Sequence, residues 1–286
     1  MTGVGRQAIA TAVAIAVLLA ACASSTGTSA RRARRAVTTT RPHVVAPAGN
    51  FSGDERLQLR TAVARGVDYV GARLTSVEPH SLMVFDYLRR NWAIAGLGGV
   101  VAVARRRGSD VGSADPLVRL VVPSRRPTRR AVAASVGTDR LLAIALECDR
   151  VSYPPSYERD LAGAAAAGGM DLTHAAFAIR FTEDLGCSPP VRARRRRGIV
   201  DALRAAVASA SSVDDLHLEQ GAMLVALDHG GSVPRSFVLR TVAAQRPDGG
   251  WAPGAGTDSN WHATGLALWL LFGAQSPGAG VAMVRS

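Results

Sequence analysis

A recurring apolar helix constrains the fold of this chain more than any other sequence feature. Three segments open with a polar residue, place histidine three positions later and continue as an apolar run that ends at glycine. The three openings are residues 171–174, 214–217 and 259–262. Their histidines are separated by 43 and then by 45 residues. Because a two-helix unit has about this length, the spacing predicts that each apolar helix alternates with a partner helix.

The segments between the apolar runs are helical in pattern but more charged, as residues 192–210 and 234–245 illustrate. An apolar helix is enclosed on all sides, whereas a charged one faces water, so the order along the chain is outer, inner, outer, inner. Apolar runs at 81–97 and 138–149 extend this order toward the N-terminus. The sequence therefore predicts one all-α domain over residues 51–286.

Two segments of this region do not read as helices. Residues 117–122 are short, apolar and flanked by proline on both sides, which is typical of a strand or a buried loop. Residues 125–130 are rich in arginine and read as a basic loop. No other segment has the alternating pattern of a strand.

The turn before the last apolar run carries a recognisable motif. It consists of Gln245, Asp248, Gly249, Gly250 and Trp251, and an apolar stretch headed by Trp and His follows it. This pattern resembles the QW-type repeat and following inner helix of the squalene-hopene cyclase and protein prenyltransferase superfamily, the terpenoid cyclase-like proteins. The resemblance implies an α/α toroid, complete or incomplete, in which outer and inner helices surround a central cavity.

The motif also implies roles for its residues. We expect Gln245 to cap the carbonyl end of the outer helix, Gly249 and Gly250 to form the turn, and Trp251 to pack between neighbouring repeats. The activity does not carry over with the fold, because the chain lacks the Asp-x-Asp-Asp proton donor of polyprenyl cyclases. Only six Phe, four Trp and four Tyr are available to line a cavity, which disfavours cyclisation of a long polyene.

Each repeat histidine follows a residue that can cap a helix, so we expect it at the third helical position. The expected caps are Asp171, Asp214 and Ser259, and the histidines are His174, His217 and His262. One interpretation is helix capping and packing at the rim. The other is that the histidines converge on one mouth of the cavity, where the positive helix ends keep them neutral for binding or acid–base chemistry.

Carboxylates near these histidines are candidate partners. Asp171 and Asp215 are near His174 and His217 in the sequence, whereas Glu219 lies two residues from His217 and faces away from it on an ideal helix. No cofactor is expected, although zinc held by His174, His217 and His262 is an alternative.

The first residues predict export and a lipid anchor. Residues 1–6 carry one arginine, residues 7–21 form an almost unbroken apolar stretch, and Leu-Ala-Ala-Cys ends at Cys22. These four residues resemble the lipobox of bacterial lipoproteins, in which the cysteine is acylated, with palmitate among the attached chains, after removal of the signal peptide 1–21. The alternative is an uncleaved apolar anchor, favoured by four arginines within residues 31–35.

Residues 22–50 are rich in Ser, Thr, Ala, Pro and Arg and read as a flexible tether that holds the domain off the bilayer. Export also changes what the remaining cysteines are expected to do. Cys148 and Cys187 each follow an apolar helical run. If the two helices are parallel neighbours, a disulfide is possible and would stabilise the fold by about 3 to 4 kcal/mol; two buried free thiols are the alternative.

Charge adds little about function. The formal net charge is +12, and arginine supplies all of its basic residues. Without interleaved aromatic residues the arginine runs do not indicate nucleic-acid binding. We therefore expect an exported protein, anchored by lipid at the outer face of the cell membrane, that binds a small molecule or envelope component in its cavity. The alternative is an envelope enzyme acting on a lipid, terpenoid or glycan with histidines at the cavity mouth.

Overall fold

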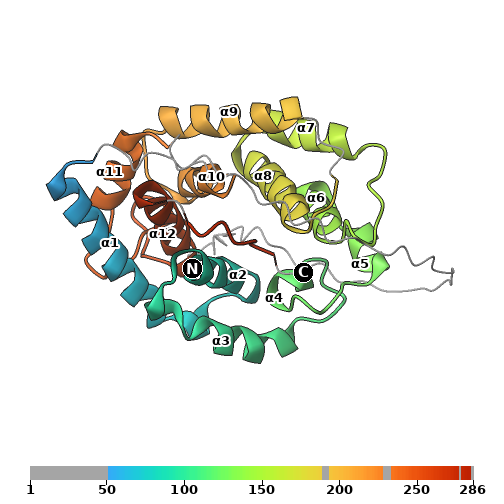
Figure 1. Cartoon of the computed structure of the whole chain (residues 1–286), viewed down its shortest axis with the longest axis horizontal. Coiled ribbons are helices and arrows are strands. Elements are labelled where there is room, and N and C mark those ends of the chain that lie inside the picture. The colour runs from blue at the N-terminus through green and yellow to red at the C-terminus, as the bar shows by residue number, and fades with distance from the viewer. Residues whose placement is uncertain (1–50, 189–192, 228–232, 277, 285–286) are drawn as a thin grey trace, which may run out of the picture. The chain divides into compact units, whose positions relative to one another are not determined.

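The alternation of apolar and charged runs produces two sets of helices (Figure 1). The computed structural model describes residues 51–188, 193–227, 233–276 and 278–284, which all belong to one unit, Thr38–Ser286. Within these ranges the elements are α-helices and short 3-10 helices, so the all-α prediction is confirmed. The predicted signal peptide, Cys22 and the tether lie outside the described residues.

The inner set consists of helices that are buried on most of their surface. Its members are α2 (Leu82–Trp92), α6 (Gly137–Leu146), α8 (Gly169–Asp184), α10 (Asp215–Ala226) and α12 (Trp261–Gln275). In α12 every residue from 263 to 271 is buried, as expected for a helix enclosed on all sides. Neighbours in this set pack in the order α6, α8, α10, α12 and α2.

The outer set consists of amphipathic helices that cover the inner ones. Its members are α1 (Gly53–Gly71), α3 (Val100–Arg107), α7 (Tyr157–Ala167), α9 (Ala193–Ser209) and α11 (Arg235–Ala243). The buried residues of α9 are Ile199, Val200, Leu203 and Val207, whose spacing of three and four residues places them on one face of the helix. Helix α1 packs against both α11 and α12 (Figure 1).

Several sequence expectations are corrected. Residues 117–122 contain the short helix α4 (Val118–Val121) rather than a strand or loop, and α5 (Arg129–Ala134) begins at the end of the expected basic loop. The inner helix expected over 81–97 ends at Trp92, because Ala93 takes a left-handed conformation with φ 54° that stops the helix. The 3-10 turns η1 (Leu74–Ser76), η2 (Pro79–Ser81), η3 (Ala95–Leu97) and η4 (Gly108–Asp110) complete this region.

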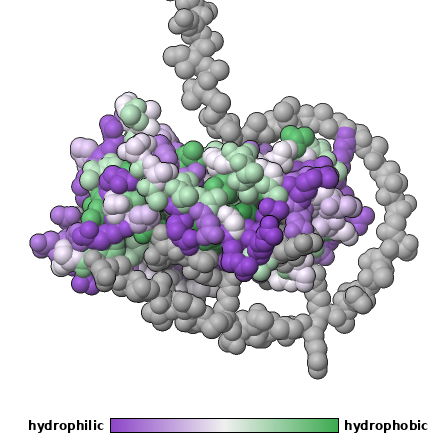
Figure 2. All heavy atoms as spheres, turned by 90° about the horizontal axis from the view of Figure 1, so that it is seen from above, coloured by the Kyte–Doolittle hydropathy of each residue, from purple (hydrophilic) through white to green (hydrophobic). Residues whose placement is uncertain are grey.

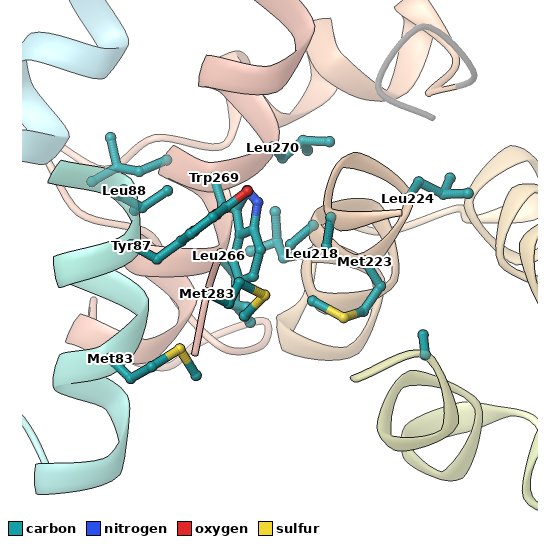
Figure 3. Packing of buried hydrophobic residues seen from close by; sticks show 14 of the residues in the cluster. Met83, Tyr87, Leu88, Leu218, Met223, Leu224, Leu266, Trp269, Leu270 and Met283 are labelled. Atoms are coloured by element: carbon teal, nitrogen blue, oxygen red, sulfur yellow. The ribbon is translucent and has the colours of Figure 1, made fainter. Parts of the chain in front are cut away.

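Aromatic and methionine side chains meet between the inner helices. Trp269 of α12 lies with its ring centroid 4.9 Å from that of Tyr87 on α2 and 6.3 Å from that of Phe177 on α8. Figure 3 shows Met223 of α10 and Met283, from the chain after α12, in the same cluster. Polarizable sulfur and ring contacts of this kind fill irregular space in a core.

Cys148 and Cys187 form a disulfide with a Cα–Cα distance of 6.2 Å. Cys148 follows α6 and Cys187 follows α8, and these two inner helices pack side by side. Of the two alternatives that the sequence left open, the structure therefore has the bonded pair. The bond joins neighbouring inner helices at their carboxyl ends.

Candidate functional site

The helices that carry the candidate residues begin in different ways. Asp214 caps α10 by accepting a 3.0 Å hydrogen bond from the backbone N–H of His217, as predicted. Asn260, rather than Ser259, caps α12 through a 2.7 Å bond from the N–H of Ala263. Helix α8 begins earlier than expected, because Gly168 with φ 74° precedes it; Asp171 is thus inside its first turn and is not a cap.

A carboxylate–histidine cluster forms where α10 and α12 begin. His262 Nδ1 lies 2.8 Å from Asp215 Oδ1. Glu219 is four residues after Asp215, so it lies on the same face of α10, one turn into the helix. Within the described residues these three side chains are the one set of His, Cys, Asp or Glu groups whose potential ligand atoms all lie within 4.8 Å of one another.

Glu219 is the most unusual acid of this cluster, because its side chain is in the interior with the whole residue only 3% exposed. Burial raises the pKa of Glu219 to about 7, against the opposing effects of the His262 charge and of a hydrogen bond from Thr173. An acid with this pKa is partly protonated near neutral pH, so it can both donate and accept a proton.

The histidine of the cluster favours its charged form. Burial alone would lower the pKa of His262, but its hydrogen bond to Asp215 and the charges of Asp215, Glu219 and Glu78 outweigh burial and raise it. His262 and Asp215 therefore form a charge-assisted pair beside the buried acid. Such a pair can take up or release a proton close to a bound ligand.

A second charged group consists of His80, Glu78 and Asp115, and the charge of Glu78 also contributes to the raised pKa of His262. His80, in the 3-10 turn ahead of α2, has Nδ1 2.7 Å from Glu78 Oε1 and Nε2 2.8 Å from Asp115 Oδ2. Burial lowers its pKa, but the two carboxylates outweigh burial and raise it to about 9. Sequence reasoning missed His80, although it too stands directly before an apolar inner helix, and that position was the available signal.

The other predicted site residues have separate partners. His217 Nδ1 lies 2.8 Å from the Asp214 carboxylate that caps its own helix. His174 Nδ1 lies 2.9 Å from the hydroxyl of Thr138, and burial lowers the pKa of His174. Asp171 accepts a weak 3.4 Å bond from the same hydroxyl. The three repeat histidines are thus not one ligand set, because successive inner helices hold corresponding positions apart.

A pocket of about 370 Å³ opens between α6 and α7, away from the cluster. The pocket has room here because Gly163 and Ala164 of α7 are small. Leu141 and Tyr157 contribute to its apolar lining. Its polar lining includes Asp171, so this predicted residue faces the pocket rather than His262. Gly137, Thr138 and Asp171 in its lining place the pocket near the amino ends of α6 and α8.

The residues of the QW-like motif join the two ends of the domain. Gln245 Nε2 donates to the carbonyls of Gly249 and of Ala62 on α1, both at 2.8 Å, so it does not cap the carbonyl end of α11. Trp251 is 1% exposed, and its indole N–H donates to Thr241 O at 2.7 Å. Trp251 thus contacts α1, α11 and α12, and the statement that these belong to neighbouring toroid repeats stays a prediction.

The turn itself is held by Asp248, whose Oδ1 accepts bonds from Gly250 N at 3.0 Å and from Ser259 Oγ at 2.8 Å. Gly249 has φ 88°, a conformation that favours glycine. A Cβ on Gly250 would lie 2.9 Å from the ring of Tyr69. Both glycines are therefore required by the turn, as the sequence predicted.

No described helix has the length and apolar character needed to cross a membrane. No family model matches the chain, and neither the curated proteins nor the solved structures contain a match.

Proposed function

We propose that this chain is a lipid-anchored envelope protein whose domain is an α/α toroid of the terpenoid cyclase-like type. The lipobox ending at Cys22 supports the anchor and the outer-face location. Two features support the toroid: the buried Trp251 motif, and the packing of the first outer helix, α1, against the last inner helix, α12. The inner helices α10 and α12 then present their amino ends at one mouth of the ring.

The working site of this protein is the cluster of Asp215, Glu219 and His262, and its ligand includes a divalent cation of the zinc type. The single observation that carries this proposal is the approach of two carboxylates and one imidazole, with ligand atoms within 4.8 Å. Nitrogen and carboxylate oxygen are ligands that zinc accepts in proteins. Two carboxylates also balance the charge of the cation.

The burial of Glu219 is better explained by a bound cation than by an apolar core without one. Keeping an acid this deeply buried is unfavourable in its ionised form, which is why its pKa rises to about 7. A bound cation would stabilise the ionised form and reverse that shift. Zinc in this position supplies Lewis-acid chemistry, whereas the chain itself supplies the Asp215–His262 pair, which holds a proton at Nδ1 in the absence of metal.

Acid–base catalysis without metal is the second candidate function. It is favoured by the pKa of about 7 for Glu219 next to a histidine whose pKa is also raised. In that case the charged His262 of the Asp215–His262 pair donates a proton to the ligand, and the ionised form of Glu219 accepts one. The proximity of a charged histidine and a carboxyl group with a pKa of about 7 suits hydrolysis of a lipid, terpenoid or glycan bond.

Metal titration separates these functions. The full chain, purified free of metal, is titrated with zinc against a competing chelator, together with Asp215→Asn and His262→Gln. We expect the wild-type protein to bind one zinc and each variant to lose at least about tenfold in affinity. His217→Gln is the matched control, since His217 lies outside the cluster. Equal zinc affinity in all four proteins contradicts the metal site.

The anchor is tested separately in cells. Metabolic labelling with a palmitate analogue is expected to mark the wild-type chain, and Cys22→Ser is expected to abolish the label and release the protein from the membrane fraction. Cys148 and Cys187 are present in both proteins and serve as the internal control. Retention of label in Cys22→Ser contradicts the lipid anchor.

A further inference from the structure

The chain after α12 returns to the interior at the end of the inner helices opposite to the cluster. Residues 278–284 run past the carboxyl ends of α2 and α8, as the red segment after α12 shows in Figure 1. Met283 and Val284 are 1% and 2% exposed. The cluster of Asp215 and His262 lies at the amino ends of α10 and α12, and the 12 residues of α10 correspond to about 18 Å of helix.

The hydrogen bonds that hold this segment are made to its backbone N–H and carbonyl groups. The donors and acceptors on the inner helices belong to Arg90, Asn91, Arg180 and Asp184. The N–H group of Ala279 donates to Asn91 O at 2.8 Å, that of Val281 to Asn91 Oδ1 at 3.2 Å, and that of Met283 to Asp184 Oδ2 at 2.7 Å. Arg180 donates to the carbonyl of Val281 at 3.0 Å, and Arg90 donates to the carbonyls of Ala282 at 2.8 Å and Met283 at 3.1 Å.

Each of these four residues also has a partner on its own helix, and Asn91 Nδ2 donates to the hydroxyl of Tyr87 at 3.3 Å. Arg180 Nε lies 3.0 Å from Asp184 Oδ1, and the two side chains are 3% and 6% exposed. Arg90 is paired with Asp86 at 2.8 Å. The polar groups that contact the segment are therefore positioned by their own helix, which is the preorganisation that a binding groove requires.

The side chains of the segment show which residue sizes and polarities the groove accepts. A Cβ on Gly278 would overlap the amide of Asn91, so only glycine fits there. Met283 lies beside Trp269 in the cluster between the inner helices (Figure 3). The groove thus accepts an extended peptide with small residues at its start and an apolar side chain near its end, through backbone bonds that tolerate other sequences.

We infer that the carboxyl ends of α2 and α8 form a peptide-binding groove, which the chain's own residues 278–284 fill in cis. The partner that fits this groove is an extended segment of another protein that begins with small residues and ends with apolar ones. Such a partner competes with the tethered segment, whose effective concentration is in the millimolar range. The groove is separate from the cluster of Asp215, Glu219 and His262, which lies at the opposite ends of the inner helices.

The face seen in Figure 2 mixes hydrophilic and apolar residues. The groove at the carboxyl ends of α2 and α8, in contrast, contains an occupant, residues 278–284. An apolar surface alone would not indicate what binds it, whereas here the seated segment defines both the backbone direction and the side-chain sizes that the partner must match.

The test uses the full chain with Met283→Asp, which places a charge in the apolar position and weakens the resident segment. A fluorescent peptide of residues 278–284, Gly-Ala-Gly-Val-Ala-Met-Val, is titrated against this variant and against the wild type. We expect saturable binding to the variant and at least about 100-fold weaker binding to the wild type, because the tethered segment competes. The same peptide carrying Asp at the methionine position is the control and should not bind.

A second variant locates the binding. Asp184→Asn is added to Met283→Asp, and because Asp184 accepts the N–H groups of Met283 and Val284, peptide affinity should fall at least tenfold. If the folded Met283→Asp chain fails to bind the peptide at millimolar concentration, or binds the control peptide equally well, the groove is not a peptide site.

Hydrogen exchange on the unmodified chain keeps the inference testable if Met283→Asp does not fold. The amides of Val281 and Met283 are expected to exchange through an opening of lower free energy than the amides of buried Trp269. If both sets exchange only on global unfolding, the segment is a permanent part of the core and the inference is wrong.

Discussion

Replacing Glu219 by glutamine should make the protein more stable at alkaline pH and leave it unchanged at acid pH. In the folded chain burial raises the pKa of Glu219 from 4.5 to about 7. The folded state therefore holds this proton more tightly than the unfolded state does. As pH rises through this interval, wild-type stability falls by about 3 kcal/mol, since each pH unit between the two pKa values corresponds to about 1.4 kcal/mol.

Glutamine is nearly isosteric with glutamic acid and does not ionise, so the Glu219→Gln variant avoids that loss. We expect equal stability for the two proteins near pH 4.5 and a variant more stable by about 3 kcal/mol at pH 8. The shift of His80 is present in both proteins and cancels in the comparison. The charge of Glu219 contributes to the raised pKa of His262, so the variant loses that part of the His262 shift. A chelator in every sample prevents metal from stabilising the wild type alone.

The assay is urea unfolding at pH 5, 6, 7 and 8, followed by tryptophan fluorescence. Glu158→Gln, on the outer helix α7, is the control for removal of a carboxylate elsewhere in the domain. The difference between Glu219→Gln and wild type should grow with pH, whereas that of the control should not. A difference that stays constant from pH 5 to pH 8 would refute the claim that burial raises the pKa of Glu219.

Three further predictions concern the scaffold. Replacing Cys148 and Cys187 together by alanine should lower the free energy of unfolding by about 4 kcal/mol for a separation of 39 residues, measured by urea titration against the oxidised wild type. Trp251→Ala should cost about 3 to 5 kcal/mol, since the ring is buried, and a loss under 1 kcal/mol would contradict its packing role. For His80, whose pKa is raised from 6.5 to about 9, the stabilisation is complete below pH 6.5 and is lost as pH rises to about 9. The stability gap between wild type and His80→Gln should therefore shrink by about 3 kcal/mol over that interval, and a gap independent of pH would exclude the shift.

The inner helices could be predicted because burial on all sides leaves a direct trace in the sequence. The run from 263 to 271 is apolar or small at nearly every position, and α12 is the result. The short helix α4 left no such trace, since four residues are too few for a helical period to be recognised and the flanking prolines favour a strand or loop.

The site was only partly predictable, because its contacts join different helices. Asp215 and His262 were both candidates, but their pairing depends on α10 and α12 lying side by side, 47 residues apart in the chain. Helical periodicity predicts that Glu219 faces away from His217 on the same helix. Its actual neighbour is His262, and periodicity within one helix carries no information about that contact.

The contacts of α1 have a consequence for how the domain folds. Ala62 and Arg65 of α1 bond Gln245, Arg246 and Pro247, about 180 residues later in the chain. Contacts of such long sequence separation form late and slow the folding reaction. The part of α1 that packs against α11 and α12 therefore stays uncovered until the last inner helix has been synthesised. This domain is expected to need protection from aggregation during synthesis more than a helical bundle with local contacts does.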